Sequence, residues 1–225
     1  MKAKLRMNRG FTLVELLVVI VIIAALAGLT APMIIRQARK ADAAEAVSNA
    51  RQIGIAMFEF QAEYGGYPGT KTQESVELAF PDQQYTLGIG DSNSCFLTLF
   101  AAEITQSEGM FYAKDGQTLG KPDGNITGAE ALKAGEVGFG YVLNAGEGMT
   151  ASGNPSRVLA VSPLDDTGAK FNPDPFDKKA VLLRIDNSVT TANIDTEGEV
   201  LIGGVALLDG EFWGTVEPEI VAPAK

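Results

Sequence analysis

The chain has 225 residues, with 18 Lys and Arg against 28 Asp and Glu, one cysteine and no histidine. Without histidine there is no Ser-His-Asp or Cys-His catalysis and no zinc site with histidine ligands, and one cysteine forms neither an intrachain disulfide nor a thiolate cluster. The formal charge of −10 gives the chain no excess of basic residues to bind phosphates, so we expect no nucleic-acid partner. Because the sequence shows no catalytic cluster, we also expect that the protein is not an enzyme.

The first ten residues form a short basic leader. They contain no acidic residue and four basic ones, Lys2, Lys4, Arg6 and Arg9. Without this leader, 14 Lys and Arg would stand against 28 Asp and Glu, a formal charge of −14. We therefore treat residues 1–10 as a segment separate from the rest of the chain.

An apolar segment of 25 residues follows, from Phe11 to Ile35, in which only Thr12, Glu15 and Thr30 are polar. As a helix it is about 37 Å long, and the hydrocarbon core of a bilayer is roughly 30 Å thick, so it is predicted to span a membrane. A secretory signal peptide has a shorter apolar region of about 7–15 residues, and a soluble core rarely buries a helix this long that is apolar all round. A plain signal anchor stays open as an alternative.

Glu15 is the residue that a plain anchor does not explain. A carboxylate within hydrocarbon costs on the order of 2.5–3.5 kcal/mol, so such a residue usually has a partner and a function. If the chain were cut after Gly10, Phe11 would gain a free α-amine four residues before Glu15. The carboxylate and an amine can neutralise each other, most usefully between staggered neighbouring helices.

The run Arg9-Gly10-Phe11-Thr12-Leu13-Val14-Glu15-Leu16 closely resembles the N-terminal signal of type IV pilins and type II secretion pseudopilins. The resemblance implies cleavage between Gly10 and Phe11 by a prepilin peptidase on the cytoplasmic face, followed by N-methylation of Phe11. It also implies that Glu15 acts in assembly by pairing with the N-terminus of an adjacent subunit. Pro32 matches a proline found in the same helix of many pilins.

Residues 36–64 continue the helix beyond the apolar segment, because their apolar positions recur every three to four residues. These positions are Val47, Ala50, Gly54, Met57, Phe60 or Gln61, and Tyr64. They are predicted to form an amphipathic half whose apolar stripe packs on a folded domain. Pro32 lacks an N–H and its ring meets the carbonyl of Gly28, which predicts a kink or local melting at residues 28–32. Gly65-Gly66-Tyr67-Pro68 is predicted to end the helix.

Residues 65–225 are predicted to form an α+β globular region. We expect a polar loop at Thr70–Glu74, a short helix within 93–103, and a tail from Val216 to Lys225 that is ordered at its start and frayed at its end. Trp213 is predicted to close the core or a subunit contact. Short β-type runs occupy the following ranges: 158–162, 180–186, 188–194 and 199–202. Asp186-Asn187-Ser188 is predicted to join two of these runs as a hairpin. One long N-terminal helix packed on a small antiparallel sheet is the pilin-like arrangement.

An acidic loop in this region is a candidate Ca²⁺ site. Five oxygen-bearing side chains are available there, those of Asp165, Asp166, Asn172, Asp174 and Asp177, and Ca²⁺ accepts six to eight oxygen ligands. Major pseudopilins resemble this chain in having a calcium loop near the C-terminal sheet, although the local sequence differs from theirs. An ordinary solvated acidic loop is the alternative.

Together these features predict a structural subunit of a type II secretion pseudopilus, a helical filament that supports protein export. The resemblance implies as partners further copies of the chain, minor pseudopilins, the prepilin peptidase and an inner-membrane assembly platform. The basic leader favours a cytoplasmic N-terminus, so we expect a single-pass protein of the bacterial inner membrane with a periplasmic domain. A type IV pilus subunit for adhesion, motility or DNA uptake is the alternative, and a membrane-anchored binding protein or enzyme is a more distant one.

Overall fold

The computed structural model describes residues 11–118, 120–152, 154–207, 213 and 216–225. The chain divides into two compact units, Met1–Ala38 and Arg39–Lys225. Helix α1 (Leu13–Tyr64) has residues in both units. Every described residue from 11 to 38 is exposed. The hydrophobic core therefore belongs to the second unit.

Within the second unit, α1 buries an apolar stripe that overlaps the predicted one: the predicted Val47 and Tyr64 are only half-buried, whereas Ala46 and Ile53 join the stripe. Ala46, Ala50, Ile53, Met57 and Phe60 recur every three to four residues, and none of them is exposed. This stripe forms one wall of the core, and its burial stabilises a helix that contains a glycine in mid-course.

Gly54 allows α1 to approach the sheet closely. A Cβ atom at this position would lie 1.9 Å from Asn187 Oδ1 and 2.9 Å from Leu183 Cδ1. On another side of the helix, Asn49 Nδ2 donates to the carbonyl oxygens of Tyr112 at 2.9 Å and Gly109 at 3.1 Å. The helix is thus held between the sheet and a loop that is distant in sequence.

The C-terminal end of α1 is where the sequence predicts it. Gly65 has φ +77°, a conformation that glycine adopts without a Cβ penalty, and its N–H donates to Gln61 O at 2.9 Å. Tyr67 then pairs its N–H with Met149 O at 2.9 Å. The glycines end the helix and turn the chain onto the rest of the domain.

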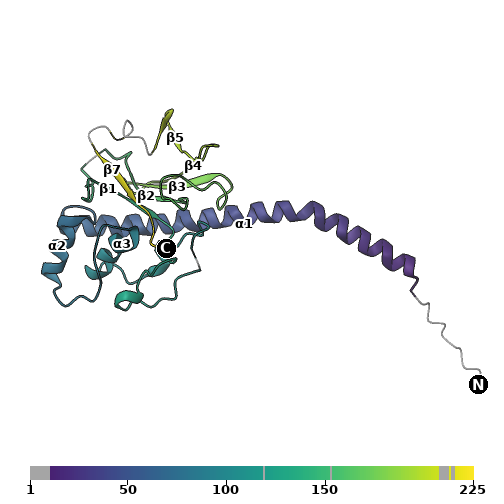
Figure 1. The fold of residues 1–225 in the computed structure, drawn as a ribbon, viewed down its shortest axis with the longest axis horizontal. Helices are drawn as coiled ribbons and strands as arrows, with labels where there is room; N and C mark the ends of the chain where they lie inside the picture. The colour runs from purple at the N-terminus through teal and green to yellow at the C-terminus, as the bar shows by residue number, and fades with distance from the viewer. Residues whose placement is uncertain (1–10, 119, 153, 208–212, 214–215) are drawn as a thin grey trace, which may run out of the picture. The chain divides into compact units, whose positions relative to one another are not determined.

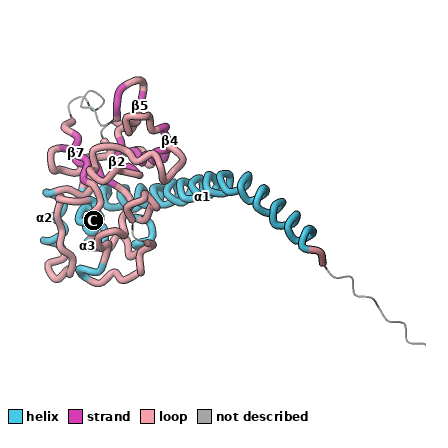
Figure 2. The backbone as a smooth tube through the Cα atoms, turned by 45° about the vertical axis from the view of Figure 1, so that its right-hand side comes forward, coloured by secondary structure: helices cyan, strands magenta, loops and turns pink. Residues whose placement is uncertain are grey.

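The main sheet has five antiparallel strands in the order β4-β3-β2-β1-β7, and β5 pairs with β6 in a second, two-stranded sheet. The strands are β1 (Gly140–Asn144), β2 (Val158–Ser162), β3 (Lys179–Arg184), β4 (Val189–Asn193), β5 (Leu201–Ile202), β6 (Val205–Ala206) and β7 (Pro218–Val221). The predicted hairpin is confirmed, because β3 and β4 pair around Asp186–Ser188. In Figures 1 and 2 the strands lie on one side of the domain part of α1, and α2 and α3 lie on the other.

One sequence prediction in this unit is wrong. The polar loop at Thr70–Glu74 is the first half of helix α2 (Thr70–Ala79). It is helical because Thr72 Oγ1 accepts from Gly69 N at 2.9 Å, and because the buried amide of Gln73 donates to Gly88 O and Thr98 Oγ1, each at 2.9 Å. These polar side chains satisfy a helix start and a buried contact instead of facing water.

The ordered start of the tail is a strand, which the sequence did not predict. Residues 218–221 form β7, which pairs with β1 in register from Asn144↔Pro218 to Tyr141↔Val221. The two prolines of the tail suggested fraying, but Pro218 lies at the first position of an edge strand, where proline is tolerated. The partner strand lies more than 70 residues earlier in the chain, so no local signal shows the pairing.

The remaining elements complete the domain. They are α3 (Ser92–Ala101), which follows the expected helix within 93–103, and the short 3₁₀ helices η1 (Glu108–Phe111) and η2 (Gly128–Glu130). Trp213 is 2% exposed and donates from Nε1 to Leu207 O at 2.8 Å, so of its two predicted roles, closing the core or a subunit contact, the structure supports the first. The observed architecture is the α+β, pilin-like layout that the sequence predicts, with one long N-terminal helix on a small antiparallel sheet.

Candidate functional site

The first turn of α1 is held by a reciprocal pair of side chains. Thr12 Oγ1 accepts from Glu15 N at 3.2 Å, while Glu15 Oε2 accepts from Thr12 N at 2.9 Å and from Thr12 Oγ1 at 2.8 Å. This is a capping box, in which Thr12 is the N-cap and Glu15 is the third helical residue. It satisfies backbone N–H groups that otherwise have no partner at a helix start.

The sequence prediction gave Glu15 a role in charge neutralisation and missed its role as a cap. The signal was present, because Thr12-Leu13-Val14-Glu15 is the pattern Ser/Thr-x-x-Glu in front of an apolar run. Capping fixes the carboxylate at the N-terminal end of the helix, where the helix dipole favours negative charge. Both hydrogen bonds from Thr12 end on Glu15 Oε2, so Oε1 is able to accept from another donor.

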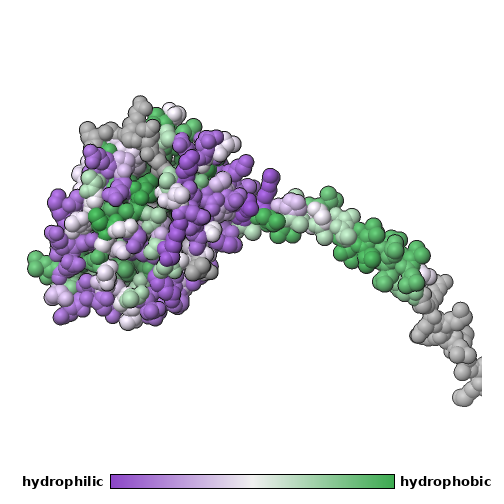
Figure 3. Space-filling view, viewed as in Figure 1, coloured by the Kyte–Doolittle hydropathy of each residue, from purple (hydrophilic) through white to green (hydrophobic). Residues whose placement is uncertain are grey.

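The part of α1 that follows is apolar and exposed on all sides. An 18-residue window has a mean hydropathy of 2.8 and no buried residue, and Leu13 and Leu29 are 87% and 78% exposed. Figure 3 shows hydrophobic surface along this segment. Among the described residues, α1 is the helix that is long and apolar enough to cross a membrane.

Polar groups within the apolar segment are satisfied locally. Thr30 Oγ1 donates to Leu26 O at 3.0 Å, and Thr12 and Glu15 bond each other. Local satisfaction is what a hydrocarbon environment requires, because water is not there to accept or donate. The segment therefore has the hydrogen-bonding pattern of a membrane helix, as well as the length and composition.

The other residues predicted for this segment are placed as follows. Gly10 lies outside the described residues, and Phe11 is 77% exposed just before the helix. The structure keeps residues 28–32 helical with Pro32 inside the helix, so local melting is not found and the kink stays a prediction. A Cβ at Gly28 would meet no atom within 4 Å, so no contact within the chain requires glycine there.

The five predicted calcium ligands are not gathered at one point. Asp165 Oδ1 accepts from Thr167 Oγ1 at 2.8 Å and Thr167 N at 3.1 Å, and Asn172 Oδ1 accepts from Asp174 N at 3.1 Å. These are local turn contacts. Across the described residues, no three Asp, Glu, Cys or His side chains form a group able to hold a metal ion.

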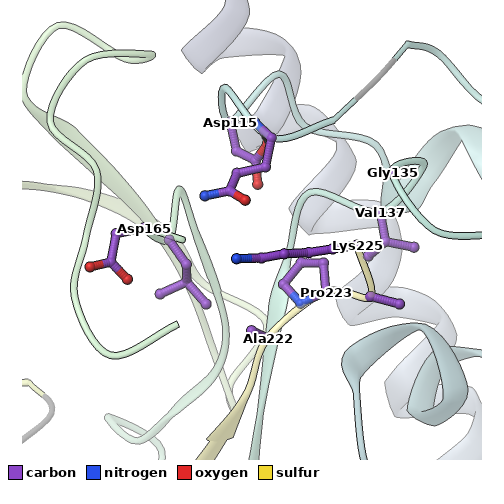
Figure 4. Close-up of a pocket in the computed structure, with 10 residues that line it drawn as sticks. Asp115, Gly135, Val137, Asp165, Ala222, Pro223 and Lys225 are labelled. Carbon is purple, nitrogen blue, oxygen red and sulfur yellow. Dashed lines mark hydrogen bonds between the residues drawn. The ribbon is translucent and has the colours of Figure 1, made fainter. Parts of the chain in front are cut away.

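The surroundings of Asp165 and Asp166 also disfavour a cation. Asp165 borders a pocket of about 160 Å³, with Asp115 and Lys225 among its other lining residues. Figure 4 shows the Lys225 side chain reaching into the space that Asp115 and Asp165 border. The Lys225 ammonium donates to the backbone carbonyl oxygen of Asp166. Asp177 lines a different groove, beside α1. The calcium hypothesis stays a prediction, without support from this arrangement.

Two buried carboxylates that the sequence did not indicate have structural partners. Glu108 is 2% exposed and accepts from Leu132 N and Gly124 N, each at 2.9 Å. Asp115 is 1% exposed and accepts from Gln117 N at 2.8 Å and from Thr118 N. Burial raises the pKa of both carboxyl groups. Their backbone partners tie loops together, which accounts for them without a catalytic role.

Cys95 is no better placed for chemistry. Its side chain is fully buried in α3, and burial raises the pKa of the thiol to about 12. A thiol is nucleophilic as the thiolate, which this group does not form near neutral pH.

Comparison with known proteins bears on the N-terminal part. Residues 5–31 match the family model of the prokaryotic N-terminal methylation motif. The chain is 40% identical over 64 residues to type II secretion system core protein G of Pectobacterium carotovorum subsp. carotovorum. That match covers 28% of this chain and 41% of the relative. No solved structure matches the chain. The resemblance drawn from the sequence is confirmed: the chain carries the methylation motif of pilin-like proteins and is similar to a type II secretion core protein.

Proposed function

We propose that the chain is a structural subunit of a type II secretion pseudopilus. The observation that carries this proposal is the coincidence of the methylation motif, residues 5–31, with a helical segment, residues 13–35, that is apolar on every side and exposed along its whole length. Such a helix needs to be covered, by lipid before assembly and by neighbouring copies afterwards. Similarity to a type II secretion core protein favours a pseudopilus over a pilus.

Processing precedes assembly in this proposal. The leader, residues 1–10, holds the N-terminus in the cytoplasm, and a prepilin peptidase cleaves between Gly10 and Phe11 and methylates the new amine. Mass spectrometry of the mature N-terminus tests this step. A bulky residue at Gly10 leaves the leader attached, whereas a cleaved Gly10 variant would contradict it.

The mature chain then spans the bacterial inner membrane once, through residues 11–35. Residues 36–64 continue the helix outside the bilayer, and residues 65–225 lie in the periplasm. A kink at Gly28–Pro32 lets neighbouring helices pack past one another. Besides further copies of itself, the subunit meets minor pseudopilins and the inner-membrane assembly platform.

Glu15 sets the axial register of the filament. Its carboxylate neutralises the α-amine of Phe11 on an adjacent subunit, because neither charge is stable alone in hydrocarbon. The capping contacts with Thr12 support this role, since they hold the carboxylate at the helix end with one oxygen able to accept from the neighbour. The same carboxylate then serves as both a cap and a contact.

Deleting the gene and comparing secreted proteins with surface fibres tests the proposal. A pseudopilus subunit is required for secretion of exported proteins. Loss of long retractile fibres with secretion unchanged would instead identify a type IV pilus subunit. An uncleaved N-terminus and no filaments would identify a membrane-anchored binding protein.

A further inference from the structure

A groove lies beside α1 in the domain, between the helix and the β4 edge of the sheet. It has a volume of about 480 Å³. Its floor is apolar, with Ala43, Ala44, Val47 and Phe176, and its remaining lining residues are Lys40, Ser48, Arg51, Asp177, Lys179 and Thr191. Three cations against one carboxylate make it locally basic in a chain with a formal charge of −10.

Within the described residues, no carboxylate pairs with the cations of the groove, although Lys179 Nζ donates to the neutral Asn193 Oδ1 at 2.5 Å. In the part of the chain that the structure describes, Lys40, Arg51 and Lys179 form no ion pair, whereas Lys114 and Lys121 pair with Asp42 and Glu45 of the same helix. A basic groove with an apolar floor fits an acidic segment that carries an apolar side chain.

Helix α2 offers such a segment. Leu78 is 85% exposed, more than the other exposed large apolar residues of the described domain, which are Ile55, Phe58 and Leu201. Glu74 and Glu77 are exposed beside it, one turn and one residue earlier, and within the described chain neither forms an ion pair. Figure 3 shows hydrophobic surface at the end of the domain where Figure 1 places α2. This knob, an exposed apolar side chain beside two glutamates, complements the groove, because Leu78 suits its apolar floor and the two carboxylates suit its cations.

The knob and the groove lie at opposite ends of the domain part of α1. The groove uses helix residues 40–51, while α2 begins five residues after α1 ends at Tyr64. From residue 45 to residue 64 the helix rises by about 28 Å. The two surfaces therefore meet between copies and not within one copy. A contact between different surfaces, displaced along the helix axis, propagates as an open array instead of closing into a dimer.

We propose that the α2 knob, Leu78 with Glu74 and Glu77, inserts into the α1–β4 groove of a second copy and forms a head-to-tail contact between soluble domains. This contact rests on the proposed filament function, to which it adds an interface outside the membrane. The apolar floor receives Leu78, and Lys40, Arg51 and Lys179 face the two glutamates. The axial offset matches growth of a filament along α1.

Disulfide cross-linking in cells that make the full chain tests the contact. Leu78→Cys is combined with Ala44→Cys, both at exposed positions, and the buried Cys95 stays inert. A disulfide requires Cα atoms about 4.4–6.8 Å apart, so it reports direct contact. We expect a ladder of dimers, trimers and longer species on non-reducing electrophoresis, since each copy carries one knob and one groove.

Two controls sharpen the test. Leu201→Cys with Ala44→Cys places the thiol on another exposed apolar residue that also has acidic neighbours, and we expect no ladder. In the chain that carries Leu78→Cys and Ala44→Cys, Lys179→Glu replaces an attraction to the glutamates of the knob by a repulsion and should reduce the amount of cross-linked species by about fivefold, the size of effect that exposed charge pairs have. Adding Glu77→Lys makes the two charges opposite again and should restore the ladder. Restoration shows that the charge contact, and not the fold, was lost.

Sheared filaments are counted separately by electron microscopy. Filaments with a ladder support both proposals, whereas filaments without a ladder overturn the groove contact and leave the filament function standing. A ladder in membranes without filaments supports the contact and overturns the filament function. A ladder only with Leu201→Cys overturns the proposed knob. Absence of a ladder and of filaments overturns both, and makes anionic lipid the next occupant of the groove to test.

Discussion

Replacing Glu15 with glutamine separates the two roles of this side chain. Glutamine suits the third position of a capping box as glutamate does, so it can accept the Thr12 N–H that Glu15 Oε2 accepts at 2.9 Å. It carries no charge and cannot neutralise the α-amine at Phe11. The Glu15→Gln variant therefore keeps the cap and loses the charge contact, whereas Thr12→Ala loses the cap and keeps the charge.

The magnitudes of the two losses differ enough to be distinguished. Losing a cap costs about 0.5–2 kcal/mol, and leaving a charge unpaired within hydrocarbon costs on the order of 2.5–3.5 kcal/mol. At about 1.4 kcal/mol for each factor of ten, Glu15→Gln weakens the addition of each subunit by about 100-fold. Thr12→Ala weakens it by about 30-fold at most.

The measurement has two parts. Mass spectrometry shows whether each precursor loses residues 1–10, and filaments sheared from cells are quantified against total protein. We expect all variants to be processed, with Glu15→Gln and Glu15→Ala both failing to enter filaments. Normal filaments from Glu15→Gln, together with none from Glu15→Ala and few from Thr12→Ala, would show that Glu15 acts as a cap and would refute the charge contact.

Three further predictions follow from the domain. Gly148→Ala places a Cβ 1.9 Å from Tyr67 O and displaces the backbone hydrogen bond from Tyr67 N to Met149 O. We expect the free energy of unfolding to fall by about 3–5 kcal/mol and the melting temperature in detergent to fall by at least about 6 °C. Gly90→Ala is the control: its Cβ meets no atom within 4 Å, so the melting temperature should not change. Burial raises the pKa of Asp115 above 3.8. The stabilisation from the protonated Asp115 carboxyl is therefore present below about pH 3.8 and is lost as the pH rises through the raised pKa of the folded state. As the pH rises through this window, the melting temperature of the wild type should fall relative to that of Asp115→Asn. Asp123 should show the opposite pH dependence. The hydrogen bond from Lys133 lowers the pKa of the Asp123 carboxyl, so the stabilisation from its charged form is present above the pKa of the unfolded state and is lost as the pH falls through the lowered pKa. Finally, if Asp165, Asp166, Asn172, Asp174 and Asp177 bind Ca²⁺, EGTA lowers the melting temperature of the full chain and excess Ca²⁺ restores it; indifference to both rejects the site.

Most of the helical and hairpin structure was open to prediction because its causes are local. The three-to-four spacing that includes Ala50, Gly54, Met57 and Phe60 predicts most of the buried face of α1, and the glycines after Tyr64 predict its end. Alternating apolar runs around Asp186–Ser188 predict the β3–β4 hairpin. In each case the residues that determine the element lie within the element or beside it, so the sequence window contains the relevant interactions.

The candidate site was predictable in part. Glu15 attracts notice because a carboxylate in an apolar run is costly, and Phe11 and Gly10 follow from the motif around it. Its contact with Thr12 was not predicted, although the capping pattern was present, because the helix was expected to begin at Phe11, which places Thr12 inside the helix, whereas α1 begins at Leu13 and Thr12 is its N-cap. The calcium ligands were grouped by proximity in sequence, whereas the fold directs Asp177 to the α1–β4 groove and leaves Asp165 by another pocket.

The sequence by itself determined the long apolar helix, the Thr-x-x-Glu pattern at its start and the resemblance to pilin-like proteins, because each depends on residues within a few turns of one another. Only the tertiary structure decided that the tail pairs with β1, that Gln73 is buried within α2, and that a basic groove lies opposite an acidic knob. Those features join residues tens of positions apart. Their free energy comes from burial and hydrogen bonds that exist only once the chain has folded.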